Sequence, residues 1–290
     1  MTTNDWLEIP NIYHDSIKWY RKGVPYSVGV TERERKLAYF YGLFTGDGFT
    51  NINRNSYDVY MSIGKNETEF AKFYDSLISD LFNRNCVHVH KSTENTRRFT
   101  HKELVQMLDC SVGISAYTKR VPEWIKKGSY EIKLAFIQGF LDTDGSVFKT
   151  KHGIRINFTS VNLELLEDIQ DILFAMEIKN SIVVHQKENI NGFGSTSQQS
   201  YRINIAMDDN TKLAENPIYE SRKIKLAKQS KSTGSRMKIK FVGDSVWLGV
   251  EKIDSSVYTG VVYNFECDTH TFMSRCIVTH NCDPLTNQRV

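Results

Sequence analysis

The segment IQGFLDTDGSVFK at residues 137–149 decides the fold, because FYGLFTGDGFTNI at residues 40–52 repeats its pattern. In both segments, apolar residues and a glycine lead into an Asp-Gly pair, and strand-forming residues follow it. The two aspartates, Asp47 and Asp144, lie 144 − 47 = 97 residues apart. Similarity at a fixed offset indicates that the chain contains two copies of one structural unit.

The similarity continues on the C-terminal side of both segments. Residues 59–82 resemble residues 154–177 at an offset of about 96. The matched apolar positions are Phe70, Phe73 and Leu77 in the first copy and Leu166, Ile169 and Leu173 in the second. Because their spacing is helical, we expect an amphipathic helix here in each copy, with Ser160 as the N-cap of the second helix.

Strand-like sequences surround these helices. Residues 49–63 and 147–159 are rich in Val, Ile, Tyr and Phe around short polar turns, which is typical of β-hairpins. Further strand-like stretches lie at residues 86–92, 181–186 and 200–207. The sequence therefore predicts an α+β fold in which each repeat begins with a helix and continues with a hairpin, strands and further helix.

The repeated Asp-Gly pairs also predict a metal site. Gly42 and Gly139 lack side chains, so the helices that carry them can approach closely and bring Asp47 and Asp144 together. A helix C-terminus is partly negative, so two carboxylates there are costly unless a cation binds, and oxygen ligands suit Mg²⁺. A single Asp-Gly pair would be typical of a plain turn, but its matched repetition favours the site. The expected ligands are Asp47, Asp144, Gly46 and Thr143.

The segments ERKLAYFYGLFTGDG and YEIKLAFIQGFLDTDG resemble the LAGLIDADG motif of homing endonucleases, at Phe40–Gly48 and Ile137–Gly145. The resemblance implies an endonuclease domain at residues 30–232, with repeats at about 30–115 and 125–228. It implies a pseudo-symmetric saddle with the order αββαββα in each repeat, acting as a monomer on double-stranded DNA. Asp47 and Asp144 would be catalytic, with Mg²⁺ polarising a phosphate in each strand and water as the nucleophile.

Two features of this motif region leave questions open. Thr45 stands where an acidic residue is common in the family. Residues 115–125 resemble the family's link between repeats, in which a Lys and a Pro precede the second motif helix. A catalytic lysine at the edge of the site is common in the family, but no motif locates it in this sequence.

Polar and basic side chains of the predicted hairpins and strands are candidates for reading bases in the major groove. They are Asn51, Asn53, Arg54, Lys149, Lys151, Arg155, His185 and Arg202. Ordinary surface exposure is the alternative for each of them. Residues 222–240 contain eight Lys or Arg and no acidic residue, which fits either a DNA-backbone contact or a solvated helix end and linker.

A second motif lies near the end of the chain. Residues 261–282, VVYNFECDTHTFMSRCIVTHNC, resemble the C-terminal motif of inteins. The resemblance implies that residues 235–281 are the all-β C-terminal half of a Hint-type splicing domain. Residues 282–290 would then be a stub of the C-extein.

The intein resemblance gives four residues catalytic roles. Asn281 cyclises through its side-chain amide and cuts the chain before Cys282. His280 polarises the attacked carbonyl, and His270 assists from the neighbouring strand. The Cys282 thiol accepts an acyl group from an upstream thioester. Asn264 stands where many family members have Asp, and an amide can only hydrogen-bond in activating Cys282.

The N-terminal splicing motifs of a complete intein, an initial Cys or Ser and a Thr-x-x-His, do not precede the first Asp-Gly segment. A split intein, completed by an N-terminal fragment with its N-extein, and a truncated chain both fit this. Residues 1–29 would form an N-terminal arm that docks the partner or covers the endonuclease, or simply a frayed end.

Composition sets further limits. The net charge of +3 neither demands nor excludes a nucleic-acid partner. Five cysteines without a CxxC pair argue against a disulfide scaffold or zinc ribbon and favour a reducing compartment. No apolar run reaches the ~18 residues of a membrane span, so we expect a cytoplasmic protein without a membrane partner.

Three functions are therefore weighed. The first combines a site-specific DNA endonuclease with a trans-splicing half-intein. The second is an RNA-intron maturase or free-standing endonuclease with a non-functional splicing remnant, which the intact His280–Asn281–Cys282 disfavours. The third is a splicing partner with an inactive nuclease, which the two retained aspartates disfavour.

Overall fold

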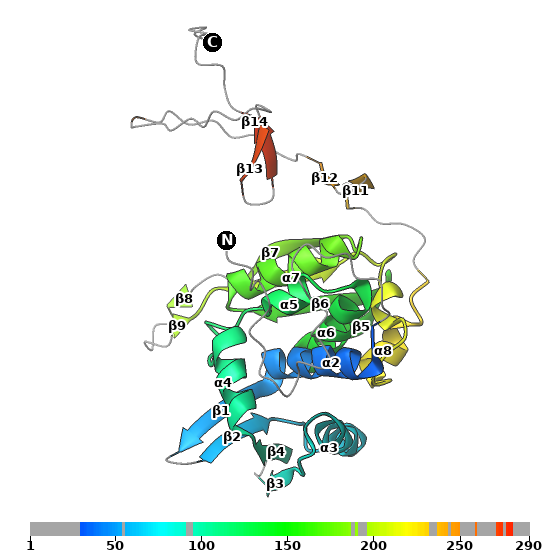
Figure 1. The fold of residues 1–290 in the computed structure, drawn as a ribbon. Helices are drawn as coiled ribbons and strands as arrows, with labels where there is room; N and C mark the ends of the chain where they lie inside the picture. Colours follow the sequence, from blue (N-terminus) through cyan, green and yellow to red (C-terminus); the bar gives the residue numbers. More distant parts are fainter. Residues whose placement is uncertain are drawn as a thin grey trace, which may run out of the picture. The chain divides into compact units, whose positions relative to one another are not determined.

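The computed structural model describes residues 30–53, 56–90, 95–186, 189–190, 196–231, 237–242, 245–249, 259, 271–274 and 277–280 (Figure 1). The described residues up to Leu248 form one compact unit, and those from Gly249 onward belong to a second. The predicted N-terminal arm at residues 1–29 lies outside the described residues.

The first unit contains the predicted repeat of αββαββα twice. The first copy runs α2 (Glu32–Asp47), β1 (Gly48–Asn53), β2 (Ser56–Met61), α3 (Thr68–Phe82), β3 (Val87–His90), β4 (Asn95–Thr100) and α4 (Lys102–Ser111). A short helix, α5 (Glu123–Lys126), lies in the link. The second copy runs α6 (Tyr130–Thr143), β5 (Gly145–Thr150), β6 (Gly153–Ser160), α7 (Leu163–Ala175), β7 (Asn180–Gln186), β10 (Ser200–Ile205) and α8 (Arg222–Ala227). Smaller elements are the β8–β9 ladder (Asn189–Ile190, Thr196–Ser197) and η1 (Lys212–Ala214).

Local sequence explains where the central helices begin. Thr31 caps α2 in a reciprocal capping box: its hydroxyl oxygen accepts the Glu34 N–H, and its own backbone N–H donates to the Glu34 carboxylate at 2.7 Å. Ser129 caps α6. The prediction of Ser160 as the cap of α7 is wrong: the Asn162 side chain accepts the Leu165 N–H at 3.1 Å, and Ser160 instead accepts the Asn162 N–H.

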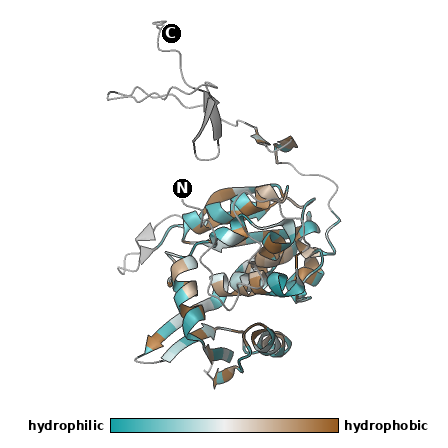
Figure 2. Ribbon diagram, in the orientation of Figure 1, coloured by the Kyte–Doolittle hydropathy of each residue, from teal (hydrophilic) through white to brown (hydrophobic). Residues whose placement is uncertain are grey.

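The two motif helices, α2 and α6, pack directly on each other through their glycines (Figure 1). A Cβ atom on Gly42 would lie 2.1 Å from the carbonyl oxygen of Phe136, and one on Gly139 would lie 2.2 Å from that of Tyr39. Only glycine therefore permits this separation between the helix backbones. The predicted close approach is confirmed, and buried residues of both helices belong to the hydrophobic core. Figure 2 shows the hydropathy of each residue along the elements of this unit.

Each repeat has one antiparallel four-stranded sheet. The strand orders are β1-β2-β4-β3 and β5-β6-β10-β7. The strand β4 was not predicted, because its sequence NTRRFT is polar. Arg97 in this strand is buried and its guanidinium donates to Asp75 of α3 at 2.9 Å, so a charged residue occupies a core-facing position.

Two further hairpins are described. In the first unit, β11 (Ile239–Val242) pairs with β12 (Ser245–Leu248). In the second unit, β13 (Thr271–Ser274) pairs with β14 (Ile277–His280), and Thr271 lies opposite His280. The strand-rich character predicted for this segment is found at these two hairpins, and the described residues do not extend to a complete splicing half-domain.

Candidate functional site

The C-terminal ends of α2 and α6 meet, and this contact places the two aspartates. A Cβ atom on Gly46 would lie 2.0 Å from Oγ1 of Thr143 and 3.4 Å from the carboxyl carbon of Asp144. Asp47 is the last residue of α2, and Asp144 is the C-cap of α6. The predicted convergence of Asp47 and Asp144 is therefore present, and both residues are exposed.

The carboxyl group of Asp144 lies in surroundings that disfavour its charged form. Removal of water from around its carboxyl group, followed by the nearby charge of Asp47, raises the pKa of Asp144 from 3.8 to about 6. Lys119 and Lys223 act in the opposite direction. Although the residue as a whole is exposed, the crowded helix ends desolvate its carboxyl group from one side.

Lys119, which sequence reasoning did not single out, is buried at the end of α2. Its ammonium group donates to the carbonyl oxygens of Phe44, Gly46 and Gly48 at 2.9, 3.0 and 2.8 Å. Desolvation lowers the pKa of Lys119 to about 8, while Asp144 and Asp47 raise it. The link segment at residues 115–125 was the signal that could have located this lysine.

Lys223 performs the same task at the end of α6. Its ammonium group donates to the carbonyl oxygens of Leu141, Asp142 and Thr143 at 3.0, 2.9 and 2.9 Å. Desolvation lowers its pKa, and nearby acids, first among them Asp142, raise it. The basic stretch at residues 222–240 therefore contributes at least one residue to the site.

These contacts change the expectation for Gly46 and Thr143 as metal ligands. The carbonyl oxygen of each already accepts a hydrogen bond from a lysine ammonium. A carbonyl has a second lone pair, so coordination is still possible in principle. In this structure, however, both carbonyl oxygens accept hydrogen bonds from lysine side chains of the protein.

The two repeats differ at the position two residues before the aspartate, which is Thr45 in the first repeat and Asp142 in the second. Thr45 in α2 turns its hydroxyl to the carbonyl oxygen of Tyr41 at 2.8 Å. Its equivalent, Asp142, accepts hydrogen bonds from Tyr39 at 2.6 Å and from Ser221, and burial raises the pKa of Asp142 to about 6. Asp142 therefore links α6 to α2 and to the start of α8, and Thr45 makes no equivalent hydrogen bond among the described residues.

The residues present fit a divalent cation bound between the helix ends. Across the described part of the chain, no cluster of three or more His, Cys, Asp or Glu is positioned to hold a metal. The protein thus offers two exposed carboxylates, and Mg²⁺ characteristically completes such a shell with water and substrate phosphate. A cation here would favour the charged form of Asp144, whose pKa is raised by desolvation and then by the charge of Asp47.

One face of each sheet is turned away from the core. Side chains alternate across a strand, so Asn51 and Asn53 share the outer face of the first sheet with Phe49, opposite to buried Val59 and Met61. Arg54 lies outside the described residues.

In the second sheet, the predicted basic residues divide between the faces. Arg155 and Arg202 share the outer face, and the Arg202 guanidinium lies 2.7 Å from Nε2 of His185. Lys149 pairs with Ile154 and therefore points to the opposite face, where it is exposed. Lys151 lies in the exposed turn between β5 and β6.

Of the four residues predicted to catalyse splicing, only His280 lies within the described residues. His280 is the last residue of β14. His270, Asn281 and Cys282 lie outside the described residues, and so does the 282–290 segment.

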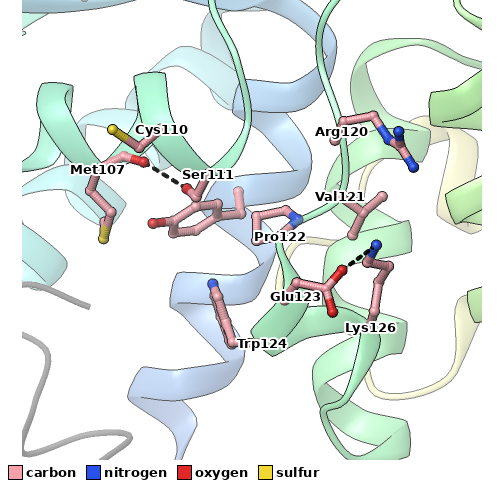
Figure 3. Close-up of a pocket in the computed structure, with 10 residues that line it drawn as sticks. Met107, Cys110, Ser111, Arg120, Val121, Pro122, Glu123, Trp124 and Lys126 are labelled. Atoms are coloured by element: carbon pink, nitrogen blue, oxygen red, sulfur yellow. Dashed lines mark hydrogen bonds and ion pairs between the residues drawn. The ribbon is translucent and has the colours of Figure 1, made fainter. Parts of the chain in front are cut away.

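A separate cavity of about 390 Å³ lies between α2, α4 and the link (Figure 3). Its lining residues are Tyr41, Met107, Cys110, Ser111, Arg120, Val121, Pro122, Glu123, Trp124 and Lys126. Neither aspartate lines it. An ion-paired cluster stands at its rim, where Arg120 donates to Asp168 at 2.8 Å, so the cavity belongs to the link that joins the repeats.

Residues 131–206 match the family model described as a LAGLIDADG-like domain. This match runs through most of the second repeat, and it confirms the LAGLIDADG resemblance there. Over the described residues, no helix is long and apolar enough to cross a membrane.

This chain spans only a small part of the first curated relatives that it matches. A DNA polymerase of Thermococcus hydrothermalis is 24% identical over 270 residues, which are 90% of this chain and 16% of the polymerase. A ribonucleoside-diphosphate reductase NrdEB subunit alpha of Bacillus subtilis is 27% identical over 179 residues, which are 54% of this chain and 16% of that protein. The homing endonuclease I-ApeI of Aeropyrum pernix is 22% identical over 153 residues, covering 49% of this chain and 67% of I-ApeI.

Among solved structures, mesophilic variants of the homing endonuclease I-DmoI align with a TM-score of 0.48 and 21% identity, covering 63% of this chain and 95% of that chain. I-DmoI in complex with DNA and Ca aligns with a TM-score of 0.47 and 20% identity, covering 66% and 93%.

Proposed function

We propose that residues 30–232 form a site-specific double-strand DNA endonuclease of the LAGLIDADG homing type. The observation that carries this proposal is the pair of exposed aspartates on abutting helix ends, next to two sheets whose outer faces carry asparagines and arginines as well as exposed aromatic residues. The match of residues 131–206 to the LAGLIDADG-like family and the similarity to I-ApeI support it.

In this mechanism, Asp47 and Asp144 would hold Mg²⁺ between the ends of α2 and α6. When bound, the ion would supply Lewis-acid polarisation of a substrate phosphate and lower the pKa of a water molecule. Lys119 caps the carbonyl oxygens at the end of α2 and Lys223 caps those at the end of α6, and both would place positive charge beside the phosphates. Both strands are cut because the repeat provides two such half-sites.

The experiment that tests this function is a cleavage assay on DNA that contains the uninterrupted host-gene junction, with and without Mg²⁺. Asp144→Asn should abolish cleavage while leaving the fold intact, since the substitution is isosteric. Cleavage by the variant at the wild-type rate would reject the assignment of the site. RNA-intron transcripts, incubated in parallel, address the less favoured maturase alternative.

We also propose that residues 235–281 are the C-terminal half of an intein splicing domain. The same chain aligns with 16% of a DNA polymerase and 16% of a ribonucleotide reductase subunit, two enzymes of different chemistry. A segment shared in this way is typical of an inserted element. The β11–β12 hairpin also leaves Trp247 and Leu248 at least 60% exposed, which favours a further apolar surface packing there.

The splicing chemistry needs no external oxidant or cofactor. The Asn281 amide nitrogen attacks its own carbonyl carbon, the bond to the Cys282 nitrogen breaks, and that nitrogen takes the proton. Cys282 would already carry the N-extein acyl group, received by transesterification from a thioester. We propose that an N-terminal intein fragment with its N-extein supplies that thioester as a separate partner chain, in the cytoplasm.

The splicing activity is tested by measuring the intact mass of the purified chain, alone and after mixing with a candidate N-terminal half. Release of residues 282–290, or their ligation to the N-extein after mixing with a candidate N-terminal half, supports splicing. If the mass stays unchanged with every such partner, residues 235–281 are a non-functional splicing remnant and the proposal is rejected.

A further inference from the structure

The outer faces of the two sheets carry different side chains at equivalent positions. In the first sheet Phe49 pairs with Tyr60, and in the second Ser146 pairs with Asn157. The offsets are 146 − 49 = 97 and 157 − 60 = 97, which is the spacing of the two aspartates. The first outward-facing pair after each Asp-Gly is therefore aromatic in one repeat and polar in the other.

One pair farther along the strands, the pattern reverses. Asn51 pairs with Asp58 in the first sheet, and the equivalent pair in the second sheet is Phe148 with Arg155. Asp58 is buried, and Ser56 and Thr100 donate hydrogen bonds to its carboxylate. Each sheet thus has one outward-facing Phe on its first strand, at different distances from the metal site.

These two phenylalanines are exposed on faces that also carry arginines. Phe49 is 37% exposed and Phe148 is 44% exposed. The Phe49 ring stacks on Tyr60 with centroids 4.8 Å apart and planes 6° apart, which fixes its orientation. Arg98 lies beside Tyr60, and Arg155 lies beside Phe148. This combination suits a DNA groove, in which arginines neutralise phosphates and Phe contacts the methyl group of thymine.

We propose that Phe49 and Phe148 are specificity-determining residues that contact thymine methyl groups at non-equivalent positions in the two half-sites of the target. This inference rests on the proposed DNA endonuclease function. A strand and a stacked base both advance by ~3.4 Å per unit, so a shift of 148 − 146 = 2 residues moves the second contact outward by about two base pairs. The target is then asymmetric in sequence although the fold is pseudo-symmetric.

The test begins with a duplex target selected by wild-type cleavage from a randomised pool. Each thymine of the selected site is replaced in turn by deoxyuridine, which removes only the methyl group. Affinity is measured in the Asp144→Asn background so that the DNA stays intact. Loss of one methyl contact should weaken binding about fourfold, at one inner thymine in one half-site and one outer thymine in the other.

Matched variants then assign each contact. Phe49→Ala should remove the sensitivity to the inner methyl alone, and Phe148→Ala should remove the sensitivity to the outer methyl alone. Ile52→Ala is the control, because Ile52 is 52% exposed on the other face of the same strand as Phe49. It should change neither response.

Two kinds of result would overturn the inference. If deoxyuridine has no effect, or the methyl responses survive both Phe variants, the phenylalanines do not read the target, while the endonuclease function stands. If the pool yields no enriched sequence, the proposed function itself fails, and the inference fails with it.

Discussion

Lys119 and Lys223 hold the ends of the two central helices in the same way, each through three hydrogen bonds from one ammonium group to backbone carbonyl oxygens. They lie 223 − 119 = 104 residues apart, close to the 97-residue spacing of Asp47 and Asp144. The partial negative charge of two helix C-termini and the charge of two carboxylates are thus balanced in part by the protein itself. The pKa of Asp144 nevertheless remains raised, by desolvation first and by the charge of Asp47 second.

Replacement of either lysine by Met should destabilise the first unit. Lys119→Met removes one donor from three carbonyl oxygens at the end of α2, of which that of Phe44 still accepts the Gly48 N–H. Each buried group left unsatisfied costs about 1–3 kcal/mol, offset by relief from burying a charge. A net loss of about 2 kcal/mol is expected in urea denaturation, together with loss of cleavage. Lys36→Met, which removes an exposed ion pair to Asp80, is the control and should be nearly neutral.

The contact between the motif helices predicts a strong effect of one methyl group. Gly42→Ala places a carbon 2.1 Å from the Phe136 carbonyl oxygen, so the helices must separate and the aspartates with them. We expect a loss of about 1–3 kcal/mol or more in the free energy of unfolding. Gly64→Ala, whose new carbon would meet only the Glu67 side chain at 3.0 Å, should change stability little; equal effects from both would show that the helix contact is not tight.

Cleavage should depend on pH through Asp144. Its pKa is raised to about 6 by desolvation and by Asp47, so the carboxyl group is mostly protonated below that value and binds Mg²⁺ poorly. Single-turnover cleavage should therefore fall as the pH drops below about 6. Because Mg²⁺ competes with the proton, more Mg²⁺ should move the midpoint to lower pH. A midpoint that is independent of Mg²⁺ would assign the titration to another group.

The two proposed activities should separate by mutation. Asn281→Ala removes the amide needed for cyclisation and should abolish release of the C-terminal segment without affecting DNA cleavage. Asp144→Asn should have the opposite effect. Loss of both activities from either single change would contradict the division into two functional parts.

The 97-residue repeat allowed the α+β fold and the meeting of the two aspartates to be predicted from sequence. Period and spacing are visible in a linear sequence when apolar residues mark the buried face, as they do on α2 and α6. The strand β4 escaped prediction because Arg97 occupies a core position, where its guanidinium donates to Asp75 on α3 and to Asn95 in the same strand.

The hydrogen bonds of Lys119 and Lys223 to the helix ends could not be predicted from the sequence either. Lys119 and Lys223 resemble many surface lysines, and their role depends on chain segments 71 to 75 and 80 to 82 residues away. The strand register was likewise needed to separate Lys149 from Arg155, since a one-residue shift would exchange their faces. Contacts between residues far apart in the chain, and the register between strands, produce no periodic pattern in the sequence.

The most direct test of the account is cleavage of a DNA duplex carrying the uninterrupted host junction, by the full chain in the presence of Mg²⁺. Both strands should be cut, a chelator should stop the reaction, and Asp47→Asn and Asp144→Asn should each abolish it although both variants remain folded. Cleavage that persists in a chelator, or in either folded variant, would contradict the claim that the meeting helix ends form the metal-dependent site.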